Sequence, residues 1–323
     1  VQMHADFLRG TGAWSGKQAL RIDIFGLKPG GTIDSQLIAP LRPESPPLVP
    51  GEKYLVEVVL RTLNVGHLFT DGTADSNEVW VEFVARSGDR IIGQSGGLAG
   101  PDDSGEVDRW AHFVKALVLD RNGNRINRHN PQDIFAAVYD HQIPPGAGQV
   151  IHYALEVPPD VTGPIELAVR LRYRKFDHEY ASYVAIQDHP EFLPLLRESS
   201  SIPDLLNRQP QAVARMLDTQ LDRVGKLPII DMCEDRIILP VAGVADNVPE
   251  QASDITPAWE RWNDYGIGCY LEGGVGAKRG ELRQAEAAFQ HLLTLGDPTA
   301  DANGYTNLAR VYLDEGRLGD AAE

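Results

Sequence analysis

The sequence predicts a multi-domain protein in which an antiparallel β-sandwich is followed by α-helical repeats. Three observations predict this fold class. Short alternating apolar runs, separated by Gly, Pro and Asn turns, fill most of the first 185 residues. Helical periods appear only towards the end of the chain, and two of them repeat one another. The length of 323 residues also exceeds what one ordinary core accommodates.

The sandwich is predicted over residues 17–185, after an N-terminal extension at residues 1–16 that has no clear period. Its strand-like runs lie at residues 18–27, 54–60, 78–84, 111–119, 149–157 and 165–173. Residues 39–51 contain five prolines and predict an extended connector, because proline fits neither a central strand nor a helix interior. Asn122-Gly123 predicts a tight turn.

Residues 186–257 are mixed in character and predict a connector packed on the sandwich. Within it we expect a helix over residues 211–224, where apolar residues share one helical face. Two short strands are expected at residues 229–230 and 237–239.

Residues 258–323 predict helices of the tetratricopeptide type. The first copy of the pattern is carried by Trp262, Tyr265, Gly266, Cys269, Ala285, Phe289 and Leu292. The second copy is carried by Tyr305, Leu308, Ala309, Tyr312, Gly316, Leu318 and Ala321. Two incomplete copies do not make a stable solenoid, so we expect the array to be truncated at Glu323 and to continue beyond it.

Charge and composition exclude several classes of partner. The formal net charge is −16, so the protein repels phosphate backbones and anionic membranes, and a partner with a basic surface is favoured over nucleic acid. The sequence contains no run of about 18 apolar residues, so it predicts no membrane-spanning helix. Cys233 and Cys269 form neither a disulfide framework nor a zinc pattern, although a pair between them stays open.

Most of the chemistry-bearing residues fall in one loop, at residues 61–80. His67 follows a glycine there and precedes Phe69. One interpretation is an axial iron ligand, since neutral imidazole binds iron well. The other is a loop histidine that hydrogen-bonds neighbouring backbone. Spacing alone favours the second.

The same loop is acidic and rich in oxygen ligands, which alternate along it at Asp71, Thr73, Asp75, Asn77 and Glu78. Hard cations such as calcium prefer ligands of this kind. The spacing does not match the twelve-residue helix-loop-helix calcium loop, so a solvated acidic turn is favoured and calcium remains the alternative.

No acid–base pair, nucleophile with a base, or phosphate-binding glycine loop is recognisable, so we expect no enzymatic activity. Arg170, Arg172 and Arg174 lie on one face of a predicted strand. Such a face is usually solvated, but it could also bind haem propionates or an acidic partner.

Several stretches together carry a resemblance to a known family. They are GHLFTDGTADSNEVWVEF, SGGL, DRNGNRINRHNPQDIFAAVYDHQIPPG and LRYRKFD. Together they resemble the haem-free, β-rich portion of periplasmic or extracellular multihaem c-type cytochromes, in some of which a tetratricopeptide region follows. The resemblance implies that His67, with His4 as a second candidate, ligates or packs beside a haem c carried on another segment or subunit. This chain has no CXXCH motif, so it holds no covalent haem itself.

Two functional hypotheses follow. In the first, the chain is a non-enzymatic module of a periplasmic or extracellular multihaem cytochrome or its complex, supporting electron transfer and binding a protein partner through its repeats. In the second, it is a haem-free interaction or adhesion scaffold.

Overall fold

The structure is a computed structural model that describes residues 2–72, 76–99, 105–126, 129–187, 227–244, 248–274 and 279–323. The helix expected over residues 211–224 lies outside these residues. In chain order, the elements that build the β-rich region are α1 (Gln2–Arg9), β1 (Leu20–Pro29), β2 (Lys53–Thr62), β3 (Glu78–Ser87), β4 (Arg90–Ser95), β5 (His112–Phe113), β6 (Ala116–Leu119), β7 (Ala136–Asp140), β8 (Gly148–Glu156), β9 (Ile165–Arg174), α2 (His178–Gln187) and β10 (Ile230–Leu239). The C-terminal helices are α6 (Trp259–Gly274), α7 (Arg279–Leu292), α8 (Pro298–Asp314) and α9 (Leu318–Ala322).

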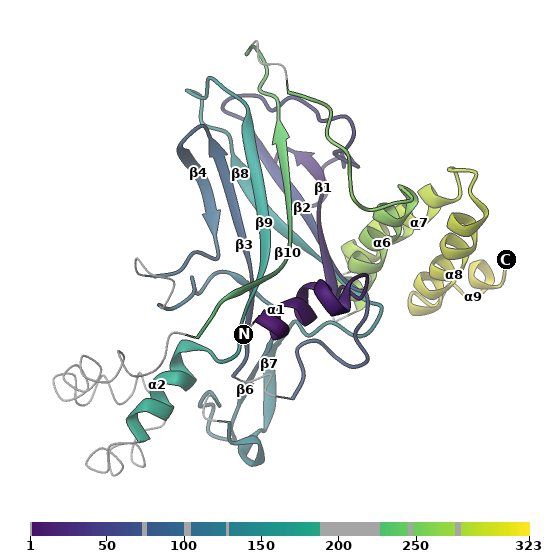
Figure 1. Ribbon diagram of the computed structural model, residues 1–323. Coiled ribbons are helices and arrows are strands. Elements are labelled where there is room, and N and C mark those ends of the chain that lie inside the picture. The colour runs from purple at the N-terminus through teal and green to yellow at the C-terminus, as the bar shows by residue number, and fades with distance from the viewer. Residues whose placement is uncertain are drawn as a thin grey trace.

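Two antiparallel sheets form the body of the molecule (Figure 1). The first has the strand order β1-β2-β8. The second has the order β10-β9-β3-β4, with β5 also paired to β3. Apolar side chains from both sheets belong to one continuous core. A separate two-stranded ribbon, β6-β7, projects below the sheets.

The pattern of apolar residues in each strand matches the faces of that strand that are buried. In β9, Ile165, Leu167, Val169 and Leu171 are fully buried and alternate with polar or small residues, as expected for a strand with one face on the core. Strand β2 instead is apolar on both faces apart from the buried Glu57, since its outer face is covered as well. Val59 on that face packs with residues of α6 and α7.

The C-terminal helices begin against the outer face of the first sheet, where α6 contacts β8, β2 and β1. Gly268 permits this close approach, because a Cβ there would lie 2.8 Å from Val150 Cγ2. Ion pairs also join helix and sheet: Arg261 Nε donates to Asp23 at 2.8 Å, and Asp264 accepts from Arg61 Nε at 3.0 Å. Helix α7 packs beside α6, and helices α8 and α9 lie farther from the sheets (Figure 1).

The structure confirms a β-rich region of antiparallel sheets followed by helices. It corrects the prediction of two short strands at residues 229–230 and 237–239. Residues 230 and 237–239 belong to the single strand β10, and residue 229 precedes it; β10 pairs with β9 along its length and shifts register between Asp231 and Cys233. The extension at residues 1–16 contains the helix α1, whose buried residues Ala5 and Leu8 join the sheet core. No helix in the described ranges is long and apolar enough to cross a membrane.

Candidate functional site

The two histidines predicted as haem-side residues lie in different surroundings. The His67 side chain is 70% exposed; its Nδ1 lies 2.8 Å from the Leu68 carbonyl oxygen and 3.6 Å from Asp71 Oδ2. A carbonyl oxygen can only accept, so Nδ1 carries the proton in this contact. His4 is on α1, and its ring stacks on Tyr173 at a centroid distance of 5.8 Å. The contacts of His67 and of His4 therefore involve different residues.

The predicted acidic ligand set is divided between solvent and core. Asp71 is exposed and accepts from the Gly72 backbone N–H at 2.7 Å. Glu78 is buried and accepts from Arg174 Nε at 2.8 Å, and Asn77 is buried beside it in the chain. Thr73 and Asp75 lie outside the described residues. Among the residues that the structure describes, no group of three or more His, Cys, Asp or Glu side chains could hold a metal ion.

The arginines of β9 have acidic partners in the neighbouring strands. Arg170 pairs with Glu82 of β3 at 2.5 Å, and Arg172 pairs with Asp231 of β10 at 3.1 Å. Arg174 pairs with Glu78 of β3. Arg172 and Arg174 are also buried, so the prediction of a solvated face is wrong for them. A buried charge without a partner is strongly unfavourable. The carboxylates of the adjacent strands neutralise these arginines.

A buried polar network lies between the first sheet and α7, and sequence reasoning missed it. Lys28 on β1 and Glu57 on β2 are ion-paired at 2.9 Å and are 2% and 0% exposed. His152 on β8 contacts Glu57 at 2.9 Å and Glu281 of α7 at 3.4 Å. Each of the four residues comes from a different element. No local spacing could therefore have revealed the network.

The surroundings of His152 in this network set its ionisation state. Burial acts to lower the pKa of His152, but the neighbouring carboxylates of Glu281 and Glu57 outweigh burial and raise the pKa to about 9. His152 is therefore an imidazolium at neutral pH. Burial also raises the pKa of the Cys269 thiol and of the Tyr265 phenol. Both cysteines of the chain are free and buried.

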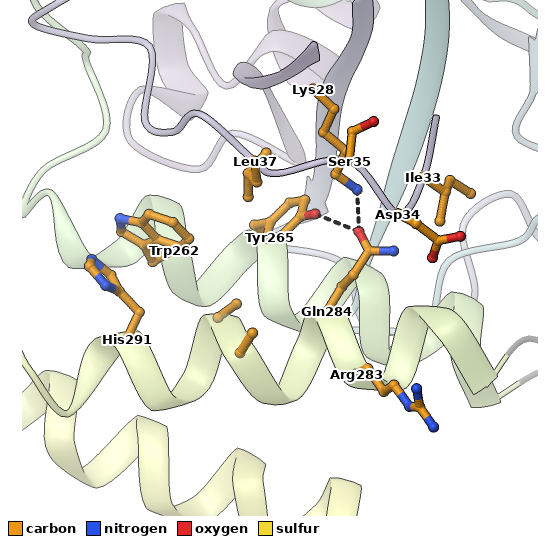
Figure 2. Close-up of a pocket in the computed structure, with 12 residues that line it drawn as sticks. Lys28, Ile33, Asp34, Ser35, Leu37, Trp262, Tyr265, Arg283, Gln284 and His291 are labelled. Carbon is orange, nitrogen blue, oxygen red and sulfur yellow. Dashed lines mark hydrogen bonds between the residues drawn. The ribbon is translucent and has the colours of Figure 1, made fainter. Parts of the chain in front are cut away.

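A cavity of about 520 Å³ opens beside this network, between the loop at residues 33–37 and helices α6 and α7 (Figure 2). Its walls include Leu37, Trp262, Tyr265 and Ala287, and its polar end is formed by Lys28 and Gln284. A mostly apolar cavity with a few fixed polar groups is the usual form of a ligand site. The sequence shows Trp262 and Tyr265 only as a helical pattern, so it gave no signal of the cavity.

Comparison with known proteins identifies no family. Neither a protein-family model nor a curated protein matches the sequence. Among solved structures, the chain is similar to a penta-heme cytochrome c552 from Thermochromatium tepidum, with a TM-score of 0.33 and 13% sequence identity. The match covers 57% of this chain and 36% of the cytochrome chain. A loose, cytochrome-related likeness at this TM-score does not establish a common fold.

Proposed function

We propose that this chain is a non-enzymatic module of a multihaem c-type cytochrome, or of its complex, and that it supports electron transfer in the periplasm or outside the cell. The observation that carries the proposal is the geometry of His67. Its Nδ1 donates to the Leu68 carbonyl oxygen, so the lone pair of the neutral imidazole is on Nε2. The side chain is mostly in solvent.

This arrangement has the form of a metal-binding histidine. Histidines that bind metals commonly donate their second ring N–H to a backbone carbonyl or carboxylate, which fixes the tautomer and raises the basicity of the ligating nitrogen. Leu68 supplies the carbonyl, and Asp71 lies within 3.6 Å of the same nitrogen. His67 would therefore hold the iron of a haem c carried on another segment or subunit through Nε2. The haem, when bound, supplies the redox chemistry, and this chain supplies the ligand and its orientation.

A titration with a ferric haem c peptide that has one open axial position tests the proposal. We expect the protein to convert the peptide to a low-spin spectrum and His67→Ala to abolish the conversion. The matched variant His4→Ala should retain it, because the His4 ring is stacked on Tyr173. Equal conversion by the protein and by His67→Ala would reject the assignment of His67.

We further propose that α6 to α9 are tetratricopeptide-like repeats. Close contacts at small residues support this assignment, as they do in helical repeats. A Cβ at Gly266 of α6 would lie 2.5 Å from the Phe289 ring of α7, and a Cβ at Gly304 of α8 would lie 2.7 Å from Leu293 Cδ2. Asn307 of α8 also donates to Asn263 of α6 at 3.0 Å.

A haem-free interaction scaffold is the second candidate function. Exposed apolar side chains on α8 and α9 favour it: Tyr305, Leu313 and Leu318 are 62%, 56% and 66% exposed. The net charge of −16 favours a partner with a basic surface. A pyridine haemochrome spectrum of the full-length protein separates the two candidates. A spectrum without haem, together with no low-spin conversion of the haem peptide, would leave the scaffold as the function.

A further inference from the structure

The cavity beside α6 and α7 has the size of a ligand site. Its volume of about 520 Å³ falls within the roughly 300–1,000 Å³ typical of sites for small molecules or side chains. Figure 2 shows Trp262 and Tyr265 at its back and α7 along its floor, with the loop at residues 33–37 opposite. None of these residues takes part in the contacts of His67, so the cavity is independent of the proposed haem ligand.

The polar end of the cavity presents a hydrogen-bond donor of fixed direction. Gln284 Oε1 accepts from Lys28 Nζ at 2.5 Å and from the Tyr265 hydroxyl at 2.9 Å. An ammonium group can only donate, so the oxygen of the carboxamide must be the atom that faces Lys28. The amide nitrogen is then directed the other way, as Figure 2 shows. A ligand at this end must therefore bring an acceptor.

The charges around the cavity compensate one another. Lys28 is neutralised by Glu57 at 2.9 Å, and at the rim Arg283 and Asp34 bring one charge of each sign. At the opposite end, burial lowers the pKa of His291, which keeps its imidazole neutral at neutral pH. An acceptor without formal charge fits these surroundings better than an anion, which the net charge of −16 would also repel.

The apolar walls define the rest of the ligand. Trp262 supplies partly exposed aromatic surface beside the buried Tyr265, and planar rings stack well on such surface. Ala287 is small and exposed on the cavity side of α7, which leaves space for a ring. Leu37 lines the cavity from the loop at residues 33–37.

We propose that this cavity binds an uncharged planar aromatic group with an adjacent carbonyl oxygen. The ring lies against Trp262 and Tyr265, and the carbonyl oxygen accepts from Gln284 Nε2. An aromatic residue of a partner peptide and a free aryl amide share this chemistry. N-acetyl-tryptophanamide serves as the probe for the shared group, and a capped pentapeptide with a central tryptophan distinguishes the two sources.

Isothermal titration of the whole protein measures binding of each probe. We expect saturable binding of N-acetyl-tryptophanamide, weaker binding of the anion indole-3-acetate, and none of N-acetyl-alaninamide, which has the carbonyl without the ring. Comparable affinity for the pentapeptide assigns the cavity to a partner segment, and its failure to bind assigns it to a free small molecule. No binding of N-acetyl-tryptophanamide at millimolar concentration overturns the proposal.

Two variants locate the binding. Ala287→Leu places a larger side chain in the cavity and should weaken binding at least about tenfold, which corresponds to about 1.4 kcal/mol. The matched control is Ala302→Leu on the exposed side of α8, which should bind as the unchanged protein does. Gln284→Glu keeps an oxygen for Lys28 and Tyr265 but removes the N–H donor, so it should also weaken binding. Unchanged affinity in both cavity variants would overturn the assignment.

Discussion

His152 should make the stability of this protein depend on pH above neutrality. It lies on β8 between Glu57 and Glu281, which contact its two ring nitrogens at 2.9 and 3.4 Å. Burial tends to lower the pKa of His152, but these two carboxylates raise it from 6.5 to about 9. A group with a raised pKa binds its proton more tightly in the folded state, so the stabilisation is complete below pH 6.5. It is lost as the pH rises to about 9.

The magnitude follows from the pKa change. A difference of about 2.5 pH units between the unfolded and folded pKa corresponds to about 3 kcal/mol, at 1.36 kcal/mol for each unit. The side chain of His152 is 22% exposed, so solvent screening reduces this value only partly. The loss should be steepest between pH 7 and 9, where the folded state still holds the proton and the unfolded state has released it.

Urea unfolding at a series of pH values measures the effect, with His152→Gln as the control. Glu57 and Glu281 face residue 152 in both proteins, and the other ionisable groups near these two carboxylates, Lys28, Tyr265 and Cys269, are unchanged. The difference between the two free energies of unfolding therefore isolates the imidazole. We expect this difference to shrink by about 3 kcal/mol from pH 6.5 to above pH 9. Parallel curves across this range would refute the reasoning.

Four substitutions test the packing and capping of the helices, each followed by the urea midpoint of unfolding. Gly266→Ala should cost about 1–3 kcal/mol, because the new Cβ would lie 2.5 Å from an aromatic ring of α7. Gly319→Ala, with open space around it, should be neutral or stabilising, and equal losses would contradict the packing argument. Arg261→Met removes both hydrogen bonds to the buried Asp23 and should cost about 3–5 kcal/mol; a loss below about 1 kcal/mol would contradict the burial of that charge. Asp297→Ala removes the N-cap of α8 and should cost about 1 kcal/mol, whereas an unchanged midpoint would show that the cap contributes nothing.

Local patterns in the sequence predicted the strands well where one face meets the core. The alternation in β9 gave both the strand and its buried side, since side chains in a strand point to opposite faces in turn. The same alternation placed Arg170, Arg172 and Arg174 on the other face but could not show what covers that face. The carboxylates that neutralise them come from β3 and β10, and strand pairing over long sequence separations brought them there.

The loop at residues 61–80 shows a similar limit. Sequence reasoning identified His67 as a loop histidine, and the contact of its Nδ1 with the neighbouring Leu68 carbonyl oxygen is compatible with both interpretations of that residue. The alternating oxygen ligands favoured a solvated acidic turn, with a calcium site as the alternative. In the structure Glu78 begins β3 and pairs with Arg174, while Asp71 is exposed. Alternation along a chain brings ligands together only if the backbone curls around the ion. Here the chain enters a strand instead.

The sequence by itself determined the β-rich region, the helices after residue 258 and the acidic field, because these depend on local periodicity and on summed charge. Only the tertiary structure decided where α6 and α7 pack, and this packing created both the buried network around Glu57 and the cavity at Gln284. The physical reason is distance along the chain. Ion pairs and cavities form between surfaces from separate elements, and their positions are set by the approach of those surfaces rather than by the pattern within either one.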